Sequence, residues 1–158
     1  MPHVPRKSRE RFPQMTVVPA APAPAIIEPD CLTITLPIPP SINHQYATVN
    51  GRRILSAAGR RYKLEIGQRI LIALARSSNK QSLLLKLRTD YVALSIRCYF
   101  TSLLRRDIDG GLKITQDALC EALGLNDNRV LELHLYKNVA AGSPSMELTL
   151  RILTSPQS

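Results

Sequence analysis

Apolar and polar residues alternate along four segments of the chain, a pattern typical of β-strands with one buried face. The longest alternation covers residues 90–100, and the others cover residues 32–36, 130–137 and 146–153. The last two segments are separated by a short Gly/Ser/Pro stretch that would form a turn. Because antiparallel neighbours are commonly joined in this way, the pattern predicts that these two strands pair with each other.

A period of three to four residues marks two main helices. The first would follow Ser56, a favourable N-cap residue, and run to about Arg76. Its apolar face would consist of Tyr62, Ile66, Ile70 and Leu74. After a polar loop at residues 77–82, the second helix would run from about Gly110 to Gly124, a favourable C-cap residue. Together, these elements predict an α+β domain with a mixed sheet of about four to five strands.

The first 30 residues differ in composition from the rest of the chain. Four basic residues precede a proline- and alanine-rich stretch, VVPAAPAPA, which does not readily form helix or sheet. We therefore expect residues 1–30 to be an extended or disordered tail and residues 31–154 to form one domain. Pro19, Pro22 and Pro24 interrupt the apolar stretch that a secretory signal needs, and no apolar run is long enough to span a membrane. The tail would either add non-specific affinity for DNA or be inert.

The chain is strongly basic, with 21 Lys and Arg residues against 12 Asp and Glu residues and a formal charge of +9. This imbalance indicates an anionic partner, with nucleic acid preferred over an anionic membrane surface. Aromatic residues make up only 4% of the chain, which disfavours stacking on single-stranded bases and favours contacts with phosphates. The three cysteines form no CxxC motif, so we expect neither disulfides nor zinc, and a cytoplasmic location.

Two clusters of basic residues are candidates for DNA contacts. Asn50-Gly51 predicts a β-hairpin, and Arg52 and Arg53 lie on its second arm. The second cluster, in the opening turns of the first helix, consists of Arg60, Arg61 and Lys63. Cations at a helix N-terminus oppose the helix dipole, so a bound phosphate would compensate them. An ordinary solvated face is the equally weighted alternative, and a membrane surface is a weaker one.

The segment RRDIDGGLK, residues 105–113, carries the strongest candidate chemistry. Asp107 and Asp109 follow a pair of arginines, and Lys113 lies four positions after the second aspartate. In an extended run the two carboxylates would lie on the same side, and Asp127 would join them if its loop folds back under the helix. Oxygen ligands suit Mg²⁺, which activates water for phosphodiester hydrolysis, while the ammonium group would hold a phosphate oxygen or orient the water. The ordinary alternative is helix capping and surface ion pairing.

Several motifs, in this order along the chain, resemble the RusA family of Holliday junction resolvases, small endonucleases of bacteria and their phages. The resemblance covers residues 32–153 and is carried by LPIPPSINHQY, SAAGRRY, RRDIDGGLKITQDAL, NDNRV and MELTLRI. It implies that Asp107, Asp109 and Asp127 bind Mg²⁺, with Mn²⁺ as an alternative ion, and that Lys113 is needed for cleavage. It also implies a homodimer, because a four-way junction must be nicked in two opposed strands.

Two positions depart from that family's pattern. Gly110 stands where asparagine is usual, and Asn126 stands where an acidic residue is usual. Both lie next to expected metal ligands and would change their surroundings. We expect a Mg²⁺-dependent crossover junction endodeoxyribonuclease that resolves branched DNA by paired nicks, with Arg105 and Arg106 anchoring phosphates and with no membrane partner or small-molecule cofactor. The alternatives are a branched-DNA-binding protein with weakened cleavage and a basic interaction or membrane-surface protein without a site.

Three further polar residues are kept outside the candidate site. His44 and His134 have no nucleophile or metal ligand near them in sequence, so both are expected to be hydrogen-bonded structural residues. Asp117 lies one helical turn after Lys113, and we expect it to pair with that lysine or to face solvent.

Overall fold

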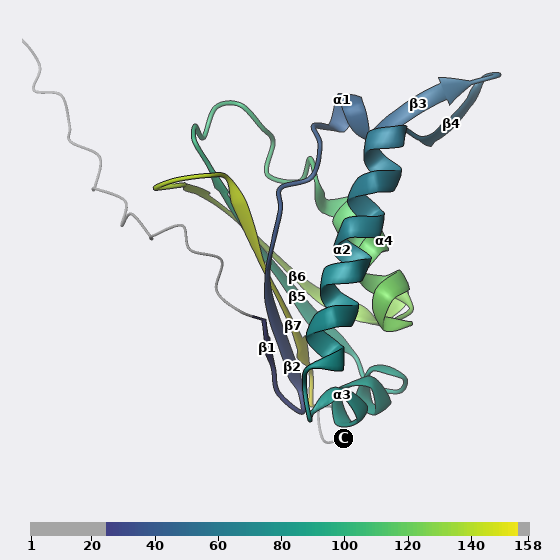
Figure 1. Ribbon diagram of the computed structural model, residues 1–158, viewed down its shortest axis with the longest axis vertical. Helices are drawn as coiled ribbons and strands as arrows, with labels where there is room; N and C mark the ends of the chain where they lie inside the picture. The colour runs from purple at the N-terminus through teal and green to yellow at the C-terminus, as the bar shows by residue number, and fades with distance from the viewer. Residues whose placement is uncertain (1–24, 155–158) are drawn as a thin grey trace, which may run out of the picture.

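The computed structural model describes residues 25–154, so most of the expected tail lies outside the described residues. These residues form a five-stranded sheet, a separate two-stranded hairpin, and helices packed against the sheet (Figure 1). This is the α+β architecture with a mixed sheet that the sequence predicts. The sheet begins before residue 31, because β1, Ile26–Ile27, pairs antiparallel with β2, Cys31–Leu36.

The sheet has the strand order β1-β2-β7-β5-β6, where β5 is Val92–Phe100, β6 is Val130–Val139 and β7 is Ser145–Ile152. β5 is parallel to β6 and antiparallel to β7, and β7 is also antiparallel to β2. The expected pairing of the last two strands with each other is therefore wrong, since β5 lies between them. A helix connects β5 to β6 and lets them lie parallel, which leaves the other edge of β5 for β7.

The two predicted main helices are present as α2, Ala57–Ala75, and α4, Leu112–Leu123. The Ser56 hydroxyl caps α2 by accepting a hydrogen bond from the Gly59 amide at 3.0 Å. Gly124 ends α4 in the left-handed conformation, with a φ of 63°, which glycine adopts at low cost. The whole predicted apolar face of α2 is buried in the core.

The expected polar loop at residues 77–82 is only partly correct, because helix α3, Lys80–Leu87, begins inside it. α3 is short and buries Leu83 and Leu87, which are four positions apart and therefore lie on the same side. Three consecutive leucines in this segment hide the helical period from a reading of the sequence.

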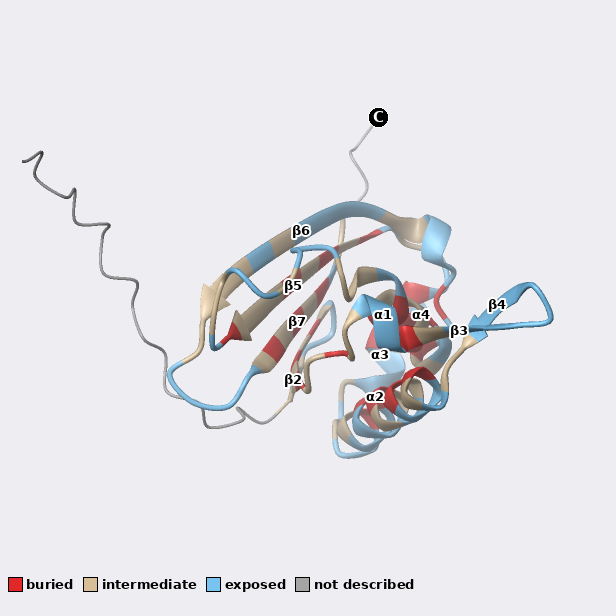
Figure 2. Cartoon of the chain, turned by 90° about the horizontal axis from the view of Figure 1, so that it is seen from above, coloured by how far each residue is buried: buried red, intermediate tan, exposed pale blue. Residues whose placement is uncertain are grey.

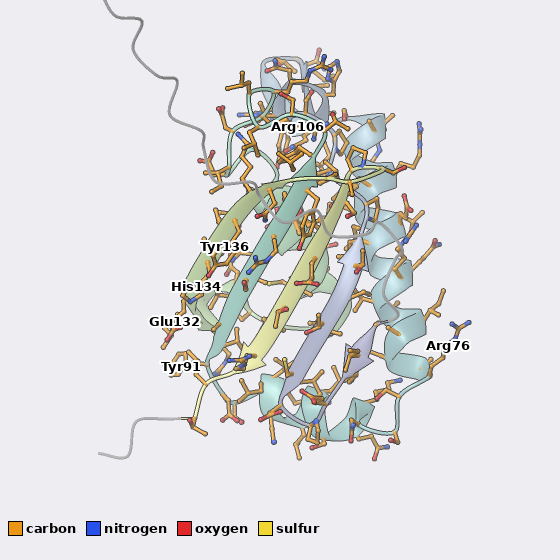
Figure 3. All side chains as sticks on the ribbon, turned by 90° about the vertical axis from the view of Figure 1, so that its left-hand side faces the viewer. Arg76, Tyr91, Arg106, Glu132, His134 and Tyr136 are labelled. Carbon is orange, nitrogen blue, oxygen red and sulfur yellow. The ribbon has the colours of Figure 1, made fainter. Side chains whose placement is uncertain are left out.

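All three of these helices lie on the same face of the sheet, and no helix of residues 25–154 covers the other face, called the open face here (Figure 2; Figure 3). Apolar residues of β2, β5 and β7 face the helices and form the core. Polar groups occupy the open face, where the Thr33 and Thr149 hydroxyls lie 3.3 Å apart and Arg97 stacks over Tyr136. The single-sided helix layer explains why alternation was so clear in these strands.

A hairpin formed by β3, Tyr46–Val49, and β4, Arg52–Leu55, extends away from the rest of the molecule (Figure 1). Asn50 and Gly51 form its turn, both with positive φ values, 50° and 73°, as a tight hairpin turn requires. The short helix α1, Ile42–Gln45, leads directly into β3. Figure 1 places α1 and the hairpin at the same end of the molecule as the start of α4.

Candidate active site

The paired aspartates lie in the loop of residues 101–111, which connects β5 to α4. The expected extended run is wrong here, because residues 107–110 form a turn in which the Gly110 amide donates to the Asp107 carbonyl at 3.2 Å. The Leu112 amide then donates to the Asp109 carbonyl at 3.0 Å. A Gly-Gly pair directly after the aspartates favours this turn. Both carboxylates are exposed to solvent.

Gln45 fixes the position of this turn, and the sequence reading did not identify it. Its side chain is 2% exposed, and its amide nitrogen donates to the Gly110 and Pro40 carbonyls, each at 2.8 Å. The Gln45 carbonyl accepts from the Ser56 amide at 3.0 Å, and a Cβ on Gly59 would lie 2.4 Å from that oxygen. Gln45 therefore ties together the aspartate turn, the base of the hairpin and the start of α2.

The two arginines before the aspartates have different environments. The Arg106 guanidinium donates to the Pro39 carbonyl and lies 5.7 Å from the centre of the Phe100 ring, and Lys137 donates to the Arg106 carbonyl. Arg105 is exposed and has no hydrogen-bond partner within residues 25–154. Arg105 is thus the arginine that is free to bind a phosphate, whereas Arg106 also holds the loop in place.

A cleft of about 250 Å³ opens beside the aspartate turn, and we call it the Asp107 cleft. Its walls come from the segment before α1, from α1, from the end of β5 and from the aspartate turn. The residues that line it include Pro39, Ile42, Phe100, Leu104, Asp107 and Ile108. Most of these side chains are apolar, so the candidate carboxylate stands at the edge of an apolar depression.

Asp127 lies in a different place. It begins the 3-10 turn η1, Asp127–Arg129. The Asn126 side chain caps this turn, because its oxygen accepts a hydrogen bond from the Asn128 amide at 3.2 Å. A shallow hollow of about 420 Å³, here called the Asp127 hollow, brings Asp127 together with Asp117, Cys120 and Glu121. η1 precedes β6, whereas the aspartate turn follows β5, so they adjoin opposite ends of these parallel strands.

Lys113 is exposed, and its ammonium group lies 3.1 Å from the Asp117 carboxylate. This confirms the expected pairing of Asp117 with Lys113. The hydrogen bond and charge of Asp117 raise the pKa of Lys113, and the charge of Asp127 acts in the same direction. Within the described part of the chain, Lys113 forms an ion pair with Asp117 and none with Asp109. Its ammonium group therefore interacts with the acidic residues of the Asp127 hollow and not with the aspartate turn.

The carboxylates expected to bind metal are not gathered into one group. Between residues 25 and 154, no three His, Cys, Asp or Glu side chains are close enough together to hold a metal ion. In the same range, the Asp107, Asp109 and Asp127 carboxylates form no ion pair and accept no hydrogen bond. Free, exposed carboxylate oxygens are the donors that Mg²⁺ prefers, so the chemistry of the set fits this ion. Their role as ligands stays a prediction.

The predicted DNA-binding cations lie near the hairpin. Arg52, Arg53, Arg60 and Arg61 are exposed, whereas Lys63 pairs with Glu121 across α2 and α4. The sequence has no Asp or Glu between residues 31 and 64, so this stretch contributes only basic charges to the surface. None of the helices found between residues 25 and 154 combines the length and apolar character of a membrane-spanning segment.

Both histidines are hydrogen-bonded, as expected. His44 Nδ1 lies 2.6 Å from the Ser41 hydroxyl, and His134 Nε2 lies 3.2 Å from the Glu132 carboxylate. Figure 3 shows His134, Glu132 and Tyr136 together along one strand, away from the end of the sheet where Arg106 lies. Neither histidine contributes to the candidate site.

No family model matches the chain. Among curated proteins, it is similar to Crossover junction endodeoxyribonuclease RusA of Escherichia coli O139:H28, with 31% identity over 119 residues that cover 75% of this chain and 92% of that protein. It is 32% identical to Crossover junction endodeoxyribonuclease rusA of Enterobacteria phage 82 over 118 residues, or 74% and 91% of the two chains. The RusA protein of E. coli K12 is 31% identical over 119 residues, or 75% and 92%.

Proposed function

Because the chain belongs to the RusA family of crossover junction endodeoxyribonucleases, we propose that it is a nuclease that hydrolyses phosphodiester bonds in four-way DNA junctions. The similarity over more than nine-tenths of the relatives' length is the observation that carries this proposal. The free carboxylates of the aspartate turn, set beside arginines in a basic protein, agree with such chemistry. The relatives come from E. coli and a phage, so we expect the protein to act in a bacterial cytoplasm.

In this proposal Asp107, Asp109 and Asp127 hold Mg²⁺, for which Mn²⁺ is an alternative ion. The bound ion would stabilise charge on the phosphate and lower the pKa of a water ligand. Mg²⁺ is usually held by one or two carboxylates, several waters and substrate phosphates rather than by a closed protein cage. A site that is completed only by DNA is therefore consistent with exposed carboxylates that are spread over two elements.

The basic residues have distinct roles in the proposal. The free guanidinium of Arg105 binds a phosphate next to the scissile bond, and Arg106 holds the loop while adding positive charge. The Lys113 ammonium exchanges its exposed contact with Asp117 for a phosphate oxygen. The exposed arginines of the hairpin and of the opening turns of α2, namely Arg52, Arg53, Arg60 and Arg61, bind phosphates farther along the arms of the junction, with Lys63 beside them.

Resolving a junction requires cuts in two opposed strands, and each chain has one candidate site. We therefore propose a homodimer with two-fold symmetry that makes paired nicks in the bound junction. Light scattering after gel filtration measures the oligomeric state directly.

The proposal is tested by cleavage of a labelled synthetic four-way junction in Mg²⁺ and in EDTA. We expect paired nicks that require Mg²⁺ and that fall by about 100-fold or more in Asp107→Asn, since losing even a residue behind a metal ligand costs about 10- to 100-fold. Binding of the junction should persist in this variant. Asp30→Asn, which removes an exposed carboxylate between β1 and β2, is the matched control. Binding by the wild type without nicking in any divalent ion would exclude the nuclease.

A second candidate function is a branched-DNA-binding protein with weakened cleavage. Gly110 and Asn126, the two departures from the family pattern, adjoin the proposed ligands. The Asn126 side chain caps η1, and so it stabilises the turn that presents Asp127 without adding a charge. This candidate predicts salt-sensitive junction binding with little Mg²⁺-dependent nicking, and the same experiment separates the two functions.

A further inference from the structure

Three large hydrophobic side chains around the Asp107 cleft are exposed to solvent. Leu104 is 96% exposed, Ile42 is 53% exposed and Ile108 is 50% exposed. They come from two segments far apart in the sequence: Ile42 belongs to helix α1, and Leu104 and Ile108 belong to the loop between β5 and α4. Exposed apolar side chains that gather around one depression, next to charged groups, indicate a binding site rather than scattered surface residues.

The cleft is already shaped without a ligand. Gly111 packs so closely on its wall that a Cβ there would lie 2.3 Å from a ring carbon of Pro39. Phe100 lies in the floor with Arg106 stacked beside it, and Arg106 is held by the Pro39 carbonyl. The side-chain amide of Gln45 fixes the carbonyl of Gly110, which also lines the cleft. A preformed apolar cleft loses little conformational freedom when it binds a ligand.

The polar groups around the cleft indicate what kind of ligand fits. Exposed Asn43 and Arg105 line it together with Asp107, and neither the Asn43 amide nor the Arg105 guanidinium has a hydrogen-bond partner within residues 25–154. A nucleobase has apolar faces, hydrogen-bonding edges and a phosphate one sugar away. The apolar side chains would contact the faces, Asn43 would reach an edge, and Arg105 would bind the phosphate.

We propose that the Asp107 cleft binds one unstacked nucleobase adjacent to the phosphodiester bond that is cut. The inference rests on the proposed function, because it takes branched DNA as the ligand. A stacked, paired base cannot enter the cleft, and unstacking is least costly where base pairing is already interrupted. The cleft would therefore favour the branch point over linear duplex, in addition to any selectivity that comes from the shape of the junction.

The first test uses junctions in which 2-aminopurine replaces single bases on either side of the scissile phosphate. The fluorescence of this base rises when it leaves the stack, and the measurement in EDTA with saturating protein needs no cleavage. We expect a rise for the wild type at one position, and loss of most of this rise in Leu104→Ser and Ile42→Ser. Leu85→Ser, which changes a 65% exposed leucine on α3, is the matched control and should behave as the wild type.

The second test combines these variants with an abasic nucleotide at the responsive position. Contact between a side chain and the face of a base stabilises the bound state. We therefore expect Leu104→Ser to lower the cleavage rate by about 10-fold on the normal junction. On the abasic junction the wild type and Leu104→Ser should cleave at the same rate, because the interacting base is absent. Leu104 is fully exposed, so its replacement should not affect folding.

Equal fluorescence in the wild type, Leu104→Ser and Leu85→Ser would overturn the inference, as would equal effects of Leu104→Ser on normal and abasic junctions. If Leu104→Ser instead dissociates a dimer on gel filtration and leaves the fluorescence unchanged, the cleft binds a second copy of the chain and the inference is also wrong. A wild type that binds and unstacks the base without cutting would contradict the proposed nuclease but retain the base-binding cleft.

Discussion

The Asp107 cleft and the Asp127 hollow each contain a candidate carboxylate and a cysteine, but the charges that act on the two cysteines have opposite signs. Burial raises the pKa of Cys98, in the cleft, to about 11. The positive charge of the nearby Arg106 acts in the opposite direction and lowers this pKa. Burial also raises the pKa of Cys120, in the hollow, to about 11, and the charges of Asp127, Asp117 and Glu121 raise it further. A cation thus lies near the thiol of the cleft, and anions lie near the thiol of the hollow.

This difference indicates how the two regions would act together. In the cleft, arginines beside apolar walls would receive a phosphate and its base. In the hollow, Asp117 and Glu121 are paired with Lys113 and Lys63, so the proposed ligand Asp127 is the carboxylate that would be available to a divalent cation. Helix α4 connects the two, with Lys113 near its start and Asp117 one turn later. Substitutions in the two regions test the comparison, from the largest expected effect to the smallest.

Asp127→Asn should reduce Mg²⁺-dependent junction cleavage by about 100-fold or more, the same loss as is expected for Asp107→Asn, although the two aspartates lie in different depressions. Asp117→Asn removes a charge from the same hollow but not a proposed ligand, so its loss of activity should be much smaller. Single-turnover cleavage at saturating Mg²⁺ measures both. Equal losses in the two variants would show that the hollow acts through its total charge and not through Asp127.

Gln45→Met should affect the cleft and leave the hollow unchanged. The substitution removes the hydrogen bonds to the Gly110 and Pro40 carbonyls, which are partly buried; a fully buried carbonyl left without a partner costs about 1–3 kcal/mol, so each of these costs less than that. We expect a lower free energy of unfolding in urea and slower cleavage. Alkylation of Cys120 in the folded protein should keep its wild-type rate. An unchanged stability would mean that water replaces the amide at both carbonyls.

Gly110→Asn introduces the residue that the resemblance to the RusA family leads us to expect at this position, and there is room for it. A Cβ there would meet the Asp107 carbonyl oxygen at 3.4 Å, an ordinary contact. We expect a modest gain in cleavage at limiting Mg²⁺, because an amide beside the aspartates can orient a ligand or its water. The Mg²⁺ concentration for half-maximal cleavage is the measurement, and a higher concentration in the variant would contradict the expectation.

The two cysteines provide the smallest effects, and these should have opposite signs. Arg106→Gln removes a cation and should raise the pKa of Cys98 further, whereas Asp117→Asn removes an anion and should lower the pKa of Cys120. Iodoacetamide labelling at several pH values, read by mass spectrometry, should therefore become slower at Cys98 and faster at Cys120. Changes of the same sign would contradict the assigned electrostatic difference.

Both thiols also make stability depend on alkaline pH. Their pKa values are higher in the folded protein than the ordinary value of 9.0, so the folded state holds these protons more tightly. The resulting stability is fully present below pH 9 and is lost as pH rises toward 11. Cys120→Ala should make the free energy of unfolding less dependent on pH in this range.

Local patterns along the sequence were sufficient to predict the elements but not their neighbours. Alternation in β5 and the 3.6-residue period in α2 reflect burial on one side, so both were predicted closely. The position of β7 depends on which edge of β5 remains unpaired after α4 has led the chain back to form β6. That depends on contacts between residues far apart in the sequence. The same limit applies to Gln45, whose partner Gly110 is 65 residues away.

The candidate residues were chosen by chemistry and resemblance, but their arrangement required the structure. The sequence identified Asp107, Asp109 and Asp127, yet it did not separate the aspartate turn from the Asp127 hollow. It also gave no reason to select Leu104, because an exposed leucine and a buried one look alike in a sequence. The exposure of Leu104 beside a cleft can be recognised only in the folded chain, where α1, the end of β5 and the aspartate turn lie together.

The position of β7 also has a consequence for synthesis on the ribosome. β7 pairs with β2 on one side and with β5 on the other, although it follows both in the chain. A nascent chain that has emerged only as far as β6 would expose the facing edges of β2 and β5, and open strand edges readily pair with other chains. The sheet can close only after residue 152 has left the exit tunnel, so folding of this domain is completed after translation of its last strand.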